Sequence, residues 1–155
     1  MFVAAFAVSA ALFSQADGEA KHAATVERLQ AAGRNVVASI MCQMGGYQVE
    51  RAGQDAYVEQ EISHAQADGM SEDEAASYLN MGISTPAAPD IGAMTRMIQR
   101  RRAGERSQAE LEGFVDKVVA RCDLLNSHTD TRGMFSAAPP NSQVARENAL
   151  QTFRP

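Results

Sequence analysis

The two cysteines of this 155-residue chain, Cys42 and Cys122, constrain its fold more than any other feature. Each lies near the carboxyl end of a stretch whose apolar residues recur every three to four positions, the spacing of an amphipathic helix. These stretches, residues 19–44 and 108–126, have the clearest helical pattern in the chain. A disulfide between them would close a loop of about 80 residues, which the chain-entropy model values at ~4–5 kcal/mol.

The rest of the chain also predicts helices and no sheet. Ala, Glu, Gln, Arg and Met dominate, whereas Val, Ile and Thr are sparse, and this balance favours helix. Two capping boxes, Ser71–Glu74 and Ser107–Glu110, mark helix starts. Further helices are expected over residues 47–67, 72–83 and 91–102. The sequence therefore predicts an all-α bundle of four to five helices, stapled by a Cys42–Cys122 disulfide.

The bridge also bears on how the helices are arranged. A disulfide between the carboxyl ends of two helices requires them to run roughly parallel. In an up-and-down bundle the first and fifth helices do run parallel, so the bridge is consistent with a bundle of five helices. Within the first helix, Cys42 faces away from the stripe of Val26, Leu29 and Ile40, as 100° per residue requires. The first helix is thus expected either to contact neighbours on two faces or to have its last turn distorted by the glycines at residues 45 and 46.

The amino-terminal residues indicate export. Residues 1–13 form an uncharged apolar run, too short to span a bilayer, although no Lys or Arg precedes it. Ser14 and Ala16 place small residues at the −3 and −1 positions of a cleavage site before Asp17. We therefore expect a secretory signal peptide over residues 1–16 and a periplasmic or secreted location, where disulfides persist. The bundle would cover residues 17–126.

The remaining residues, 127–155, are polar and contain Pro, Ser and Asn. They predict a flexible, largely irregular tail with one short helix over residues 143–152.

Composition and motifs narrow the function. The net charge of −5 and the few aromatic residues argue against nucleic-acid binding, which depends on Lys and Arg. No nucleotide-binding loop or nucleophile motif is present, so the sequence assigns no catalytic residue and no cofactor. The favoured interpretation is a non-enzymatic exported protein that works through protein–protein contacts. An inhibitor or immunity-type protein and an envelope accessory factor both fit.

Two Glu-x-x-His pairs support an alternative, a small metal-binding bundle. On a helix this spacing places a carboxylate and an imidazole on one side, as in ferritin-like di-iron sites. Such a site also needs a Glu from each of two further helices, for which Glu74 and Glu112 are available but not singled out. The paired residues are Glu19 with His22, and Glu61 with His64.

An arginine cluster is the most unusual surface feature. It comprises Arg96, Arg100, Arg101, Arg102 and Arg106, at the end of a predicted helix in an otherwise acidic chain. One interpretation is a solvated helix end that complements the helix dipole, or pairs with the acidic residues 72–74. The other is a docking patch for an acidic protein partner or for peripheral contact with an anionic membrane surface.

Overall fold

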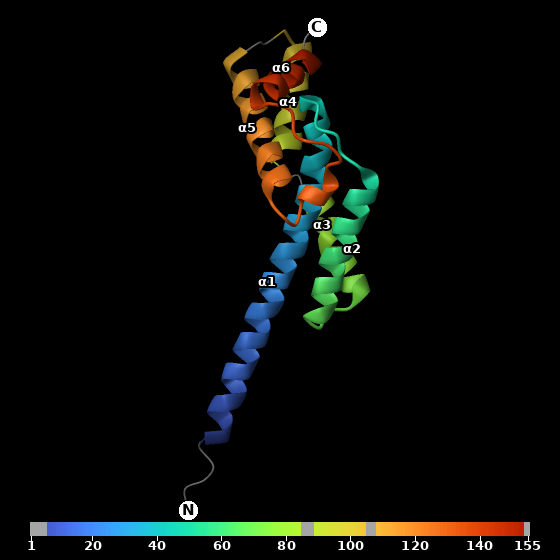
Figure 1. Cartoon of the computed structure of the whole chain (residues 1–155). Coiled ribbons are helices and arrows are strands. Elements are labelled where there is room, and N and C mark those ends of the chain that lie inside the picture. The colour runs from blue at the N-terminus through green and yellow to red at the C-terminus, as the bar shows by residue number, and fades with distance from the viewer. Residues whose placement is uncertain (1–5, 85–88, 105–107, 154–155) are drawn as a thin grey trace, which may run out of the picture.

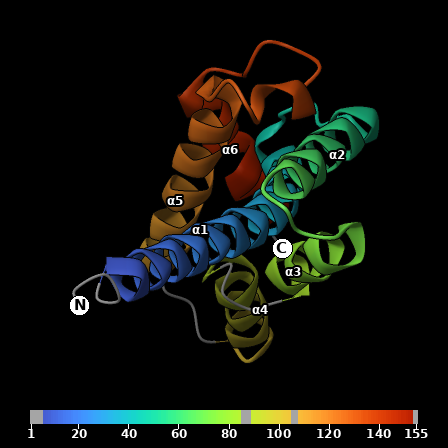
Figure 2. The same ribbon diagram turned by 90° about the horizontal axis from the view of Figure 1, so that it is seen from below.

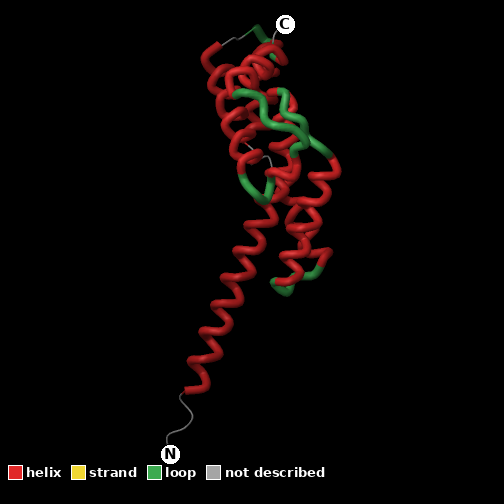
Figure 3. The backbone as a smooth tube through the Cα atoms, viewed as in Figure 1, coloured by secondary structure: helices red, strands yellow, loops and turns green. Residues whose placement is uncertain are grey.

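The computed structural model describes residues 6–84, 89–104 and 108–153, and over these ranges the protein is all-α. Figure 3 shows helices along almost the whole backbone. The only strand-like pairing in the described residues is an isolated bridge between Val49 and Phe135. The helices are α1 (Phe6–Cys42), η1 (Gln43–Gly45), α2 (Arg51–Ala67), α3 (Glu72–Ser84), α4 (Pro89–Arg102), α5 (Gln108–Ser127), η2 (Arg132–Met134) and α6 (Ser142–Thr152).

The 37-residue helix α1 is the axis of the molecule. Figure 1 shows α5 on one side of it and α2 and α3 on the other, and Figure 2, seen from below, shows these three helices around α1. Leu29 and Ala32 are buried against α2 and α3, whereas Met41 and Cys42 are buried in a second core with α5 and α6. The expectation that this helix has two contact faces is therefore confirmed. Ile40 is the exception, because its side chain is 52% exposed just beyond the end of the α1–α3 contact.

Two glycines bring α1 and α3 together. A Cβ on Gly33 would overlap the carbonyl oxygen of Leu79, and a Cβ on Gly82 would overlap the carbonyl oxygen of Gln30. The two helix backbones therefore lie in direct contact at this crossing. Since close packing of this kind leaves no space for a methyl group, both positions require glycine.

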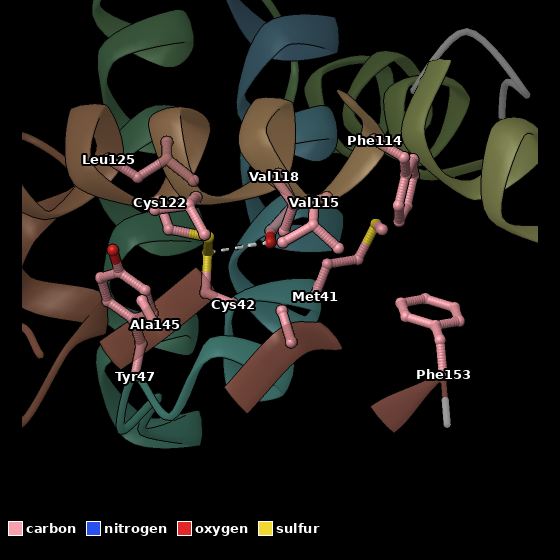
Figure 4. Close-up of a cluster of buried hydrophobic side chains, with 13 residues drawn as sticks. Met41, Cys42, Tyr47, Phe114, Val115, Val118, Cys122, Leu125, Ala145 and Phe153 are labelled. Atoms are coloured by element: carbon pink, nitrogen blue, oxygen red, sulfur yellow. Dashed lines mark hydrogen bonds between the residues drawn. A yellow bond between two sulfur atoms is a disulfide. The ribbon is translucent and has the colours of Figure 1, made fainter. Parts of the chain in front are cut away.

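The predicted disulfide is present. Cys42 and Cys122 have Cα atoms 5.6 Å apart, and both residues are buried in the core that Phe114, Val115 and their neighbours complete. Figure 4 shows the bond at the point where α5 passes over the end of α1.

The predicted direction of α5 is wrong. In Figure 1 α1 rises from the amino terminus, whereas α5 starts at the top and descends across it, so the two helices are not parallel. The bridge fixes the distance between two Cα atoms and leaves the direction of each helix free. Because Cys122 lies five residues before the end of α5, the chain can cross α1 there.

The start of α3 is capped as the sequence predicts. The amide of Glu74 donates to the Ser71 hydroxyl at 3.3 Å, as the first capping box predicts. Ser107 of the second box lies outside the described residues. After α1, Gly46 adopts a φ of 86°, which favours glycine and turns the chain toward α2.

Residues 127–155 hold more structure than the expected irregular tail. The short helix is confirmed as α6, which begins behind Asn141, whose side chain accepts a hydrogen bond from the amide of Gln143 at 2.8 Å. Ala145 and Ala149 are buried against α5 and η1, and Met134 of η2 is fully buried under α2. The apolar residues are too few to form a visible stripe, but Met134, Ala145 and Ala149 fill gaps in the bundle.

The amino-terminal part of α1 projects from the body as a single arm (Figures 1 and 3). The helix continues through the expected cleavage site at Ala16 without a break. Side chains from residue 17 to residue 24 are exposed, and burial begins at Thr25. Over the described residues, no helix has the length and apolar character needed to cross a bilayer.

Candidate functional site

A continuous row of polar side chains lies between α1 and α2, and we call it the polar seam. The two helices run antiparallel and meet through hydrogen bonds and ion pairs along most of their shared length. The seam consists of Thr25, Arg28, Asn35 and Ser39 of α1 and Gln54, Tyr57, Glu61 and Asp68 of α2.

The upper part of the seam consists of hydrogen bonds between uncharged side chains of α1 and α2. The amide of Gln54 donates to the hydroxyl of Ser39 at 2.8 Å. The amide of Asn35 donates to the phenol oxygen of Tyr57 at 3.0 Å. On its other side Asn35 accepts from the guanidinium of Arg121, which ties α5 to the seam. Burial raises the pKa of the Tyr57 phenol, so this phenol stays protonated across the physiological range.

The lower part of the seam is ionic, and in it Asp68 has more hydrogen-bond and ion-pair partners than Glu61 has. The Asp68 carboxylate accepts from the Thr25 hydroxyl at 3.0 Å and lies 3.1 Å from the Lys21 ammonium. A nitrogen of Arg28 donates to it at 3.3 Å. Hydrogen bonds from Lys21 and Thr25 lower the pKa of Asp68 below its ordinary value. Asp68 is the C-cap residue directly after α2, so these bonds fasten the end of α2 to α1.

Glu61 has the opposite environment. Its side chain is 8% exposed, and its Oε2 atom lies 3.3 Å from Nε of Arg28. The alignment is poor, so neither of these two buried atoms completes a hydrogen bond. Burial raises the pKa of the Glu61 carboxyl, and the attraction of Arg28 offsets this only in part. The Arg28 guanidinium thus lies near two carboxylates, and it forms a hydrogen bond with Asp68 but not with Glu61.

The Glu-x-x-His pairs do not come together. Nε2 of His22 lies 3.8 Å from Glu74, one of the two glutamates available from other helices, while Glu61 faces Arg28. Glu112, the other available glutamate, pairs with Arg146 at 3.3 Å. Across residues 6–84, 89–104 and 108–153 no three His, Cys, Asp or Glu side chains are grouped so that they could hold a metal ion. Glu19 is exposed on the arm of α1, and His64 is exposed on α2.

The arginine cluster lies at the end of α4. Arg96 and Arg100 are exposed, and Arg100 forms an ion pair with the exposed Glu110 of α5 at 2.8 Å. Arg101 and Arg102 occupy the last turn of α4, but their side chains, like Arg106 as a whole, lie outside the described residues. The acidic residues 72–74 begin α3 at the opposite end of the body (Figure 1), so they do not pair with Arg100.

Sequence reasoning missed the polar seam, although the sequence holds a sign of it. Thr25, Arg28, Asn35 and Ser39 recur at intervals of three, seven and four residues, which places them along one side of a helix. This polar stripe lies beside the apolar one and indicates a polar partner helix.

Comparison with known proteins gives no relative: no protein-family model, no curated protein and no solved structure matches this chain.

Proposed function

We propose that the protein is exported and acts by binding an acidic protein through the arginine-rich end of α4. The observation that supports this binding role is the position of the arginine cluster. Arg96 and Arg100 are exposed at one end of an acidic protein, and the acidic start of α3 lies at the other end. Separated charges of opposite sign create a field that orients an incoming partner and raises its association rate.

Two observations support export. The Cys42–Cys122 disulfide is buried in the larger core, and structural disulfides persist in oxidising compartments. The arm of α1 projects from the body, and the first ion pair from α1 to the body involves Lys21. Removal of residues 1–16 would therefore leave the two cores intact. The inhibitor, immunity-type and envelope accessory roles are all forms of this proposal.

Processing is the test of export. When the full chain is expressed with its own amino terminus in a bacterium that secretes proteins, we expect mature protein beginning at Asp17 outside the cytoplasm. Intact-mass measurement of the purified protein and amino-terminal sequencing check this result. Ala16→Tyr is the matched change, since a bulky residue at the −1 position blocks cleavage. Full-length protein that stays in the cytoplasm in both forms would contradict export.

Charge reversal at α4 is the test of binding. The Arg96→Glu, Arg100→Glu protein is expected to capture its acidic partner at least tenfold less well at low salt, because two attractive charges become repulsive. Its folding should be nearly unchanged, since the exposed Arg100–Glu110 pair is worth about 0–1 kcal/mol. Affinity capture from the native extract, quantified by mass spectrometry, measures the loss.

Arg51→Glu is the matched control for that experiment. Arg51 is 91% exposed at the start of α2 and forms only a 4.0 Å pair with Asp55. This variant should capture the partner as the parent does. Equal capture by all three proteins would overturn the proposal. Loss of binding to anionic vesicles, with protein capture unchanged, would assign the cluster to a membrane surface instead.

A further inference from the structure

The lower part of the polar seam holds a buried carboxylate, Glu61, that is poorly paired. Glu61 is 8% exposed, and the one cation beside it, Arg28, is 40% exposed and also donates to Asp68. Lys21 completes the pairing of Asp68. Two cations therefore serve Asp68, and Glu61 has only the poorly aligned share of Arg28.

Several other groups act on Glu61. The groups that influence its carboxylate are Arg28 from α1, His64 from the next turn of α2, and Asp130 from the segment between α5 and η2. The carboxylate in turn acts on Tyr57, one helical turn earlier. Arg28 and His64 attract this carboxylate and Asp130 repels it, but its loss of solvation on burial is the largest influence. Binding a proton removes the charge of a carboxylate buried in this position and so lowers the free-energy cost of its burial.

We propose that Glu61 is a proton-binding switch of the α1–α2 contact. As pH falls, Glu61 takes one proton from solvent and becomes a neutral carboxylic acid, Arg28 pairs with Asp68 alone, and α2 packs firmly on α1. As pH rises, the proton returns to solvent, the poorly paired charge reappears between α1 and α2, and α2 is held less firmly.

The sign of the effect follows from linkage. The pKa of Glu61 in the folded protein is above its ordinary value of 4.5, so between these two values the folded state binds more protons than the unfolded state. Stability of the α1–α2 contact therefore rises as pH falls through this window and stops rising below 4.5. Asp68 has the opposite shift, from an ordinary value of 3.8 downward, so its contribution is lost only at still lower pH.

Hydrogen exchange of the full chain between pH 4.5 and pH 8 tests the switch. After correction for the intrinsic pH dependence of exchange, amides of α2 should lose protection as pH rises. The limit for one proton is about tenfold per pH unit. Amides of α5 around Cys122 are an internal reference. In Glu61→Gln, which keeps the shape without the charge, α2 should lose less protection than in the parent protein as pH rises over this window.

Glu59→Gln is the matched control, because Glu59 lies on the exposed side of the same helix. It should behave as the parent protein does. Carbon-13 NMR titration of the Glu61 carboxyl in the unaltered protein gives a readout that needs no variant to fold. A Glu61 carboxyl that titrates at or below 4.5, or identical pH profiles for α2 in the parent and Glu61→Gln, would overturn the proposal.

Discussion

Alanine at Gly82 is expected to lower the free energy of unfolding by about 3 kcal/mol, at the upper end of the range for overpacked cores. The added Cβ would meet the carbonyl oxygen, carbonyl carbon and Cα of Gln30, all of them backbone atoms. A flexible side chain could move aside, but here the whole of α3 has to move away from α1. The separation would also open the contacts of Leu29 with Ala75 in the same core.

Urea unfolding followed by circular dichroism measures this loss. Gly113→Ala is the matched control, because Gly113 lies exposed in α5 with open space around its Cα atom. There alanine should add about 0.5–1 kcal/mol, the difference in helix propensity between the two residues. If both glycine substitutions stabilise the protein, α1 and α3 do not touch through their backbones.

Removal of the disulfide is expected to have the largest effect of any change in the chain. The double variant Cys42→Ala, Cys122→Ala should lose about 4–5 kcal/mol, because a crosslink that spans 80 residues restricts the unfolded chain strongly. Two alanines avoid a reactive lone thiol. Since small domains have only about 5–15 kcal/mol of stability, the midpoint of urea unfolding should fall by a large fraction.

Reduction of the unaltered protein provides the control. Urea unfolding in excess dithiothreitol should reproduce the midpoint of the double variant, since both lack the same bond. Midpoints that are equal with and without the bond would mean that the disulfide adds nothing to stability.

The sequence predicts the elements of this fold better than their arrangement. Helix starts are local, so the Ser71 capping box and the short helix after Asn141 could be read from a few neighbouring residues. The disulfide was also predictable, because the chain has two cysteines and each lies in a strong helix. The direction of α5 was not, since it depends on how α5 packs against α1 and α6.

The candidate site was harder to predict for a related reason. Glu61 looks like an ordinary solvated helix residue in the sequence, and burial of its side chain alone makes it unusual. Burial is a property of the tertiary contact between α1 and α2, and a single-helix pattern does not contain it. Conversely, Ile40 fits the apolar stripe but lies beyond the end of the helix that would cover it. The periodicity of apolar residues predicts which way a side chain points, but it does not predict how far the neighbouring helix extends.

The long helix α1 has a consequence for how the protein loses its structure. Both cores use it: Leu29 and Ala32 lie in one, Met41 and Cys42 in the other, and no loop separates the two sets. We therefore expect the two cores to lose their structure in one global unfolding transition, before which single helices such as α2 can still open locally.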